Sequence, residues 1–228
     1  MLGVKALLPI IPIFEGLTDT ELEAISPFFV ERSYKRGMIV CLEGDIGGEM
    51  YVIKKGSVRV YRSLVDKDVI LSFLRKGDCF GEMALFDESQ TRSATVETLE
   101  PTILYVLKRH DFLIFLQAHP PMAVRLLELT MARLRKANER IQNLNLLNAR
   151  SRIIRTIFFL ANEYGVQKGQ ELMIDFKLTH QQIADLTGFV RETVSAILIE
   201  LREEGLIEIE QKKIRIKNFE LLEEQVTY

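Results

Sequence analysis

The sequence contains few of the residues that build covalent or metal-centred structure. Its 228 residues include only Cys41 and Cys79, too few for a disulfide framework, which suits a reducing cytoplasm. These cysteines and the three histidines are scattered without the spacing of metal ligands, so we expect no metal site. No run of 18 apolar residues occurs, which excludes a membrane-spanning helix. The remainder, with 47% hydrophobic and 27% charged residues, is typical of a soluble globular protein.

Two further features are weak or missing at the level of the whole chain. The apolar N-terminus is short, is interrupted by Pro9 and Pro12, and lacks a small-residue cleavage site, so we expect mature structure there and not a signal peptide. Lysine and arginine number 30 against 32 acidic residues, a net charge of −2. This balance excludes a protein that binds nucleic acid through bulk positive charge, but it permits a local basic surface.

Glycine and proline are unevenly distributed and divide the chain. Seven of the 13 glycines lie between Gly37 and Gly81, none follows until Gly165, and the last proline is Pro121. The first third is therefore turn-rich and the remainder helix-rich. A short helix is predicted over 19–22 with Thr18 as its N-cap. Short alternating or β-branched runs predict an antiparallel barrel or sandwich with strands at 50–53, 57–61, 69–74, 93–99 and 103–107.

A long helix is predicted over 122–148, where neither glycine nor proline occurs. One stripe on it repeats in steps of four and three, the 3.5-residue period of a coiled-coil seam. The stripe consists of Ala123, Leu127, Thr130, Leu134, Ala137, Ile141, Leu144 and Asn148. A second apolar set consists of Leu126, Leu129, Leu146 and Leu147. The two sets favour one face packed on the helix's own domain and the other on a partner helix in a parallel dimer.

The C-terminal third has the pattern of a winged helix-turn-helix. After a helix over 153–165, Thr179 can cap a helix that begins at His180. A helix-turn-helix needs a small residue at the helix crossing, glycine in the turn and apolar residues inward, and these are Ala184, Gly188, Val194 and Ile197. The second helix, over about 190–204, then presents Val190, Arg191, Glu192 and Ser195 outward at the end that enters a DNA major groove. A hairpin around Gln211 follows, with Lys212 and Lys213 in reach of phosphate. The alternative is a three-helix core without DNA, in which Arg191 and Glu192 pair with each other.

A second informative segment covers residues 77–96. Gly81 to Leu85 predicts a helical turn after a strand, and free N–H groups at such a turn form an anion nest. Arg92 and Ser93 offer a guanidinium and a hydroxyl that suit phosphate oxygens, and Glu82 can accept a hydrogen bond from a ribose hydroxyl. This set fits a phosphorylated sugar. A structural ion pair between Glu82 and Arg92 is the alternative.

These motifs resemble the Crp/Fnr family of transcription regulators, in its cyclic-AMP receptor (catabolite activator) branch. The resemblance rests on 77–86 and 91–94, which are similar to a phosphate-binding cassette, and on 188–194. It implies an α+β fold with a β-roll at 1–120, a dimerisation helix at 121–149 and a winged helix-turn-helix at 150–228. It also implies a homodimer that binds palindromic DNA and contacts RNA polymerase. No catalytic constellation is evident, so we do not expect an enzyme.

The resemblance also implies roles for individual residues. Glu82 would bond the ribose 2′-hydroxyl, and Arg92 and Ser93 the cyclic phosphate. Backbone N–H groups at Gly81, Met83 and Ala84 would line the nest. In the DNA-binding part, the residues that would read base edges are Arg191 and Glu192, and those that would hold phosphates are Gln181 and Thr193.

The chain departs from this branch at several positions. The pair that contacts adenine is replaced by Ala137 and Asn138, of which only Asn138 can bond a purine edge, and a third base-reading arginine is replaced by Ala196. The iron–sulfur branch needs more cysteines than are present. The haem branch places ligands where Gly81 and Met83 stand, and we expect Met83 to lie in the core. Three hypotheses remain: a cyclic-AMP-controlled regulator, the same DNA-binding dimer with another effector or none, and a nucleotide-binding regulatory subunit that acts on a protein.

Even the segment expected to bind DNA is not basic overall. Residues 150–228 hold 11 basic and 13 acidic side chains, and many of the acids follow residue 200. The cations expected on the groove-facing side are Arg150, Arg152, Arg155, Arg191, Lys212 and Lys213. Few phosphates would then be neutralised, which predicts weak binding to random DNA and a shallow salt dependence.

Overall fold

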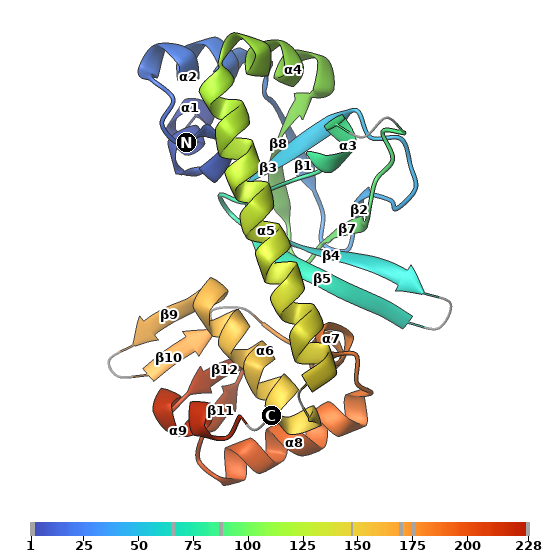
Figure 1. Ribbon diagram of the computed structural model, residues 1–228, viewed down its shortest axis with the longest axis vertical. Coiled ribbons are helices and arrows are strands. Elements are labelled where there is room, and N and C mark those ends of the chain that lie inside the picture. The colour runs from blue at the N-terminus through green and yellow to red at the C-terminus, as the bar shows by residue number, and fades with distance from the viewer. Residues whose placement is uncertain are drawn as a thin grey trace. The chain divides into compact units, whose positions relative to one another are not determined.

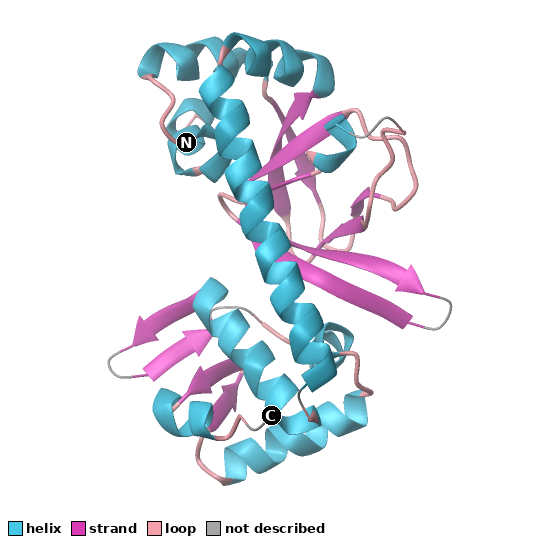
Figure 2. Cartoon of the chain, viewed as in Figure 1, coloured by secondary structure: helices cyan, strands magenta, loops and turns pink. Residues whose placement is uncertain are grey.

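The computed structural model describes residues 3–64, 67–86, 89–146, 148–168, 171–174 and 177–226 (Figures 1 and 2). The chain divides into two compact units, Met1–Leu134 and Arg135–Tyr228, which are described separately below. The three-part division expected from the sequence stays a prediction. None of the helices in the described ranges is long and apolar enough to cross a membrane.

The N-terminal unit begins with short helices, most of which bury at least one apolar residue. These are α1 (Val4–Leu7), η1 (Leu8–Ile10), η2 (Pro12–Phe14), α2 (Asp19–Ile25) and η3 (Ser26–Phe28). The predicted cap of α2 is confirmed as a capping box, in which the Thr18 hydroxyl accepts from Glu21 N at 3.3 Å and the Glu21 carboxylate accepts from Thr18 N at 2.7 Å. The segment before α2 is therefore folded structure, with Leu8, Ile11 and Phe14 fully buried.

Two antiparallel four-stranded sheets follow and confirm the predicted sandwich. The first has the order β1 (Val30–Tyr34), β8 (Thr102–Lys108), β3 (Glu49–Lys55) and β6 (Cys79–Phe80). The second has the order β2 (Ile39–Cys41), β7 (Thr95–Thr98), β4 (Ser57–Leu64) and β5 (Lys67–Arg75). A one-turn helix, α3 (Met83–Phe86), lies between β6 and β7 in the sequence. Inward-facing residues of both sheets form one core, including Ile53, Leu104 and Val106 from the first sheet and Val58 and Val96 from the second.

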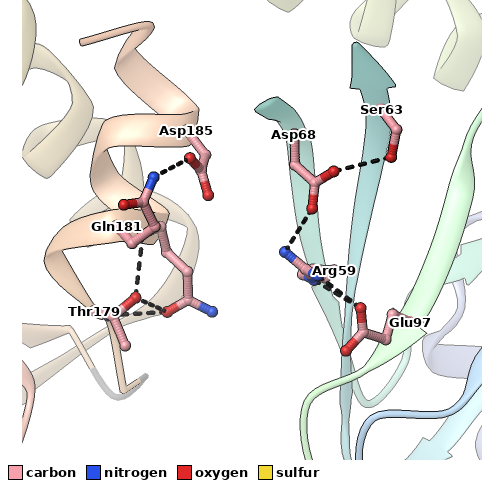
Figure 3. Close-up of polar contacts among 8 residues, drawn as sticks. Arg59, Ser63, Asp68, Glu97, Thr179, Gln181 and Asp185 are labelled. Carbon is pink, nitrogen blue, oxygen red and sulfur yellow. Dashed lines mark hydrogen bonds and ion pairs between the residues drawn. The ribbon is translucent and has the colours of Figure 1, made fainter. Parts of the chain in front are cut away.

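Charged residues join the strands of the second sheet. Arg59 on β4 pairs with Glu97 on β7 at 2.7 Å and with Asp68 on β5 at 3.4 Å (Figure 3). Ser63 donates to the same Asp68 carboxylate at 2.9 Å. These contacts bridge β4 to both of its neighbours, and the pairs Arg59–Glu97 and Ser63–Asp68 lie directly opposite each other in the strand register.

The other face of the first sheet is covered by helices. Two more, α4 (Arg109–Ala118) and α5 (Pro120–Leu146), complete the N-terminal helical layer. Met50, Val52 and Leu107 alternate with the inward-facing residues of their strands and pack in a second core with the N-terminal helices. Leu126 and Leu129 of α5 pack on this core, which confirms the expected intramolecular contact for them. The other two members of that set, Leu146 and Leu147, lie outside the described side chains.

The C-terminal unit is a winged helix-turn-helix. Its helices are α6 (Ala149–Tyr164), α7 (His180–Thr187), α8 (Arg191–Glu203) and α9 (Phe219–Glu224). Its sheet has the order β11 (Ile207–Glu210), β12 (Lys213–Ile216), β10 (Glu171–Ile174) and β9 (Gly165–Lys168). The structure adds the β9–β10 hairpin between α6 and α7, where the sequence predicts no strand. The interpretation of Asn148 as the last seam residue is wrong, since its side chain accepts from Ser151 N at 2.8 Å and caps α6.

Candidate effector site and DNA-binding surface

The predicted helical turn after β6 is present and begins at a glycine that the geometry requires. Gly81 has φ of +83°, a conformation that side chains strongly disfavour. A Cβ atom there would lie 2.7 Å from Nη1 of Arg92 and 3.1 Å from the Glu49 carbonyl oxygen. Glycine therefore lets the backbone of the turn approach the Arg92 side chain.

Arg92 is buried at the centre of this cassette. The residue is only 7% exposed, and its Nη1 donates a hydrogen bond to the Gly81 carbonyl at 3.0 Å. The backbone of Arg92 makes two hydrogen bonds to the loop that contains Gly44 and Asp45. Its N–H donates to Asp45 O at 2.8 Å, and its carbonyl accepts from Gly44 N at 2.9 Å. Gly47 leaves room for the guanidinium, because a Cβ atom there would lie 2.5 Å from Nε of Arg92.

The structure adds three residues around Arg92 that the sequence interpretation missed. The guanidinium lies 5.5 Å from the ring centroid of Tyr51, whose hydroxyl donates to Glu49 Oε2 at 3.0 Å. Arg32 donates to both oxygens of Glu49, at 2.6 and 2.8 Å. Glu49 and Tyr51 are two residues apart on β3, so their side chains lie on the same face of the strand. The alternation of side chains along a strand could have predicted this pairing from the sequence.

The ionisation of this cluster follows from its contacts. Burial alone would raise the pKa of Glu49, but the hydrogen bonds from Arg32 and Tyr51 and the charges of Arg32 and Arg92 outweigh it and lower the pKa. Burial, together with nearby Cys41 and Glu49, raises the pKa of Tyr51. At neutral pH the tyrosine is a protonated donor and Glu49 is a carboxylate.

The other predicted cassette residues lie beside Arg92 and Gly81. Glu82 is 8% exposed and Ala84 is 1% exposed, whereas Ser93 is exposed and lies near the Met83 sulfur, with its hydroxyl 3.7 Å from Sδ. The expectation that Met83 belongs to the core is wrong, because it is 62% exposed. A one-turn helix has a solvent side, and Met83 occupies it. Both cysteines are buried, and burial raises the pKa of the Cys41 thiol.

The predicted seam of α5 is exposed where the structure describes it. Leu127 and Leu134 are 57% and 52% exposed, and Thr130 is also exposed. Ala137 and Asn138 are exposed as well and belong to the C-terminal unit. The side chains of Ile141 and Leu144 lie outside the described part of the chain.

The helix-turn-helix has the expected internal contacts. Thr179 caps α7 through a capping box with Gln182, and the helix ends at Thr187 with Gly188 as its C-cap, which has φ of +77°. Ala184 is fully buried where the helices pack, and Val194 and Ile197 face inward from α8. The sequence therefore identified this motif residue by residue.

The outward face of α8 differs from the predicted set at one position. Val190 is 63% exposed, Arg191 and Glu192 are exposed, and Thr193 is half-buried. Ser195 is half-buried and its hydroxyl lies 2.7 Å from Nδ1 of His180, so it is shared between the surface and an internal bond.

The other residues predicted to contact DNA lie on α7 and on the wing. Gln181 is exposed at the start of α7, and its amide donates to Asp185 at 2.7 Å (Figure 3). The wing turns at Gln211 and Lys212, which have φ of +51° and +67°, and Lys212 is exposed while Lys213 is half-buried. The Lys212 carbonyl accepts from Leu178 N at 2.7 Å, which ties the wing to the segment before α7.

Two of the arginines expected to face the groove make contacts within the C-terminal unit. Arg150 pairs with Glu200 at 3.2 Å and with Glu204 at 2.5 Å, which links α6 to α8. The Arg152 guanidinium lies 4.7 Å from the Phe189 ring centroid and donates to the Thr187 carbonyl at 3.3 Å. Both arginines are therefore engaged by contacts within the C-terminal unit, and their groove-facing role stays a prediction.

Both units match known domain families. Residues 31–119 match the cyclic nucleotide-binding domain and residues 151–225 match the Crp-like helix-turn-helix domain. The first match covers the sandwich and the cassette, and the second covers α6 to α9.

Whole-chain similarities agree with these domains. The chain is 34% identical to the cyclic AMP receptor protein of Thermus thermophilus over 93% of its own length and 95% of that protein. It is 33% identical to a crystal structure of the catabolite activator protein of Thermus thermophilus, with a TM-score of 0.55 and coverage of 93% and 97%. It is 25% identical to a structure of CLP from Xanthomonas campestris, described as a global regulator responsive to cyclic di-GMP, with a TM-score of 0.73 and coverage of 88% and 100%.

Proposed function

Because the chain belongs to the Crp/Fnr family of DNA-binding transcription regulators, we propose that it is a cytoplasmic homodimer whose binding to a palindromic operator is controlled by cyclic AMP. The matched domains and the relatives are those of regulators and not of enzymes. RNA polymerase is the protein partner that we assign to the operator-bound dimer.

The effector assignment rests above all on the burial of Arg92 beside the turn at Gly81. Arg92 is 7% exposed, and its guanidinium lies beside the turn where the N–H groups of Gly81, Met83 and Ala84 can line an anion nest. Arg92 has five N–H donors, so it can bind a phosphate while one donor bonds to Gly81. In this proposal Ser93 also binds the phosphate and buried Glu82 accepts a bond from the ribose 2′-hydroxyl. Ala137 and Asn138 contact the base.

The DNA-binding assignment rests on the exposed first turn of α8. Arg191 reads guanine and Glu192 reads cytosine, since these side chains match the donor and acceptor patterns of those bases. Val190 and Ser195 contact adjoining groove positions. The residues that bind phosphates in this proposal are Gln181 and Thr193 beside the groove and Lys212 and Lys213 on the wing.

The dimer assignment rests on the exposed seam of α5. Leu127 and Leu134 are both more than half exposed, although Leu126 and Leu129 of the same helix pack on the core between the first sheet and the N-terminal helices. A second copy of the helix would cover the seam formed by Leu127, Thr130, Leu134, Ala137, Ile141 and Leu144.

A second candidate keeps the DNA-binding dimer but changes the effector. Ala137 has no polar group for adenine, and the similar protein from Xanthomonas campestris is described as responsive to cyclic di-GMP. Another nucleotide, or none, would then control the operator affinity. A regulatory subunit that acts on a protein partner is disfavoured by the complete helix-turn-helix.

One titration separates these candidates. The protein is footprinted on its own promoter region, and operator affinity is measured with cyclic AMP, cyclic GMP and buffer alone. We expect cyclic AMP to tighten binding by at least about 5-fold, the lower range of typical allosteric coupling. Equal affinity in all three conditions would overturn cyclic AMP and support the second candidate. The absence of any specific footprint would overturn the operator-binding function itself.

A further inference from the structure

The Arg92 guanidinium is placed by an aromatic ring that is itself immobilised. Tyr51 is 4% exposed and stacks on Phe80 with centroids 5.0 Å apart and planes 15° apart. Its ring lies 5.5 Å from Cζ of Arg92. This distance is within the range in which the ring quadrupole attracts a cation, and the attraction is stronger when the pair is desolvated.

The tyrosine hydroxyl is anchored at its far end. It donates to Glu49 at 3.0 Å, and both oxygens of Glu49 also accept from Arg32, at 2.6 and 2.8 Å. A carboxylate that accepts two hydrogen bonds from one guanidinium has little rotational freedom. The Tyr51 ring, whose hydroxyl donates to this carboxylate, is therefore restrained as well. The chain of contacts therefore runs from Arg32 on β1 through Glu49 and Tyr51 on β3 to Arg92.

We propose that Tyr51 and Glu49 are positioning residues that hold the Arg92 guanidinium toward the nest before the effector arrives. The proposal rests on the proposed function, in which Arg92 binds the effector phosphate. An arginine side chain has many rotamers, and ordering it on binding would weaken affinity. A cation ordered in advance avoids that loss, and the Glu49 carboxylate offsets part of the cost of burying it.

Two glycines leave the space that the Arg92 guanidinium occupies. Cβ atoms at Gly47 and Gly81 would lie 2.5 and 2.7 Å from its guanidinium, so any side chain at either position would collide with it. The Gly81 Cβ position is also 3.3 Å from the Tyr51 ring. The ring and the turn thus enclose the same guanidinium.

The first test uses the full-length protein without effector and measures the Nε–H signal of Arg92 by NMR. The signal is assigned by its loss in Arg92→Lys. We expect hydrogen exchange to become at least about 10-fold faster in Tyr51→Leu, because the ring that covers the guanidinium is gone. Tyr51→Phe keeps the ring and should change exchange less. Unchanged exchange and an unchanged chemical shift in Tyr51→Leu would overturn the proposal.

The second test measures cyclic AMP affinity by calorimetry. We expect Tyr51→Leu to weaken it by about 10-fold, the size of a desolvated cation–π contact, and Tyr51→Phe by less. Tyr105→Phe is the matched control, since Tyr105 is 5% exposed and also lies beneath a cation, Lys54, at 4.9 Å, but outside the cassette. Its affinity should equal that of the wild type. A loss in Tyr105→Phe as large as that in Tyr51→Phe would assign Tyr51 a general structural role and overturn the proposal.

A double-mutant cycle shows whether Tyr51 acts through Arg92. In an Arg92→Lys background the Tyr51→Leu change should cost much less than in the wild type, because residues that share one interaction are not additive. The same fold-loss in both backgrounds would overturn the proposal. If the wild type binds no cyclic AMP, the proposed effector fails, and the NMR comparison still decides whether Tyr51 holds Arg92.

Discussion

The effector cassette and the recognition helix are built in opposite ways. Arg92 and Glu82 are 7% and 8% exposed and are placed by side chains and glycines around them. Val190 is 63% exposed, and Arg191 and Glu192 are also exposed. The positions of these side chains are therefore set by the backbone at the start of α8 and not by packing around them. A buried site is therefore ordered by packing before it binds, whereas the exposed one is free to adapt to bases. Substitutions should separate the two, with combined effects on binding and stability in the cassette and an effect on binding alone at Arg191.

The largest effect is expected from Arg92→Leu. Losing two charge-assisted bonds to a phosphate should weaken cyclic AMP binding by at least about 100-fold, as measured by calorimetry. The variant also loses the bond from Arg92 to the Gly81 carbonyl, so urea unfolding should show a loss of stability of about 1–3 kcal/mol. Arg62→Leu is the control, because Arg62 pairs with Glu43 at the surface and its side chain is 59% exposed. Unchanged affinity in Arg92→Leu would remove the phosphate from this site.

Gly81→Ala tests whether packing orders the cassette. Gly77→Ala is a close control, because Gly77 has φ of +93° and nothing within 4 Å of its Cβ position, while Gly81 has φ of +83° and would place Cβ 2.7 Å from Arg92. Both variants carry the backbone strain, about 1–2 kcal/mol, but only Gly81→Ala adds the clash, at about 1 kcal/mol or more. Urea unfolding should rank Gly81→Ala as the less stable, and only this variant should lose effector affinity. Equal stabilities would show that the guanidinium moves aside easily.

The two regions also differ in how far the sequence predicted them. The helix-turn-helix depends on local contacts, so Thr179, Gly188 and Val194 could each be given a correct structural role from spacing alone. In the cassette, the pattern identified Arg92 but not Tyr51, which lies 41 residues earlier on another strand. Alternation shows which face of β3 is buried, but it does not show which loop packs there.

The remaining errors also arise where one residue type suits two structures. Asn148 continues a 3.5-residue repeat and is equally a good N-cap, and only the contact with Ser151 decides for the cap. Strand β10 (Glu171–Ile174) contains one β-branched residue, so propensity gave little signal for the β9–β10 hairpin. Pairing with β12 stabilises β10 as a strand although its own strand propensity is low.

On the recognition helix, Arg191→Ala should change binding without changing stability. We expect a relaxed preference at one base position, worth about 1–3 kcal/mol, measured by operator affinity across single-base variants. Exposed substitutions of this kind usually change stability by no more than about 0.5 kcal/mol. Arg202→Ala, an exposed arginine in the last turn of the same helix, is the control and should leave base preference unchanged. A uniform loss across all sequences would assign Arg191 to a phosphate and not to a base.

The smallest effect is expected at the start of α8. Val190 at this position does not cap the helix with its side chain, but it is proposed to contact the operator. The other helices of the C-terminal unit, α6, α7 and α9, are capped by side chains of Asn148, Thr179 and Asn218, but α8 follows Val190, which makes no such bond. Val190→Ser should therefore raise the free energy of unfolding by about 0.5–1 kcal/mol. The reverse change, Thr179→Val on α7, should lower it by a similar amount. If Val190 contacts the operator, the more stable Val190→Ser protein should bind DNA no more tightly than the wild type. A stabilised variant that also binds more tightly would show that Val190 has no part in the contact.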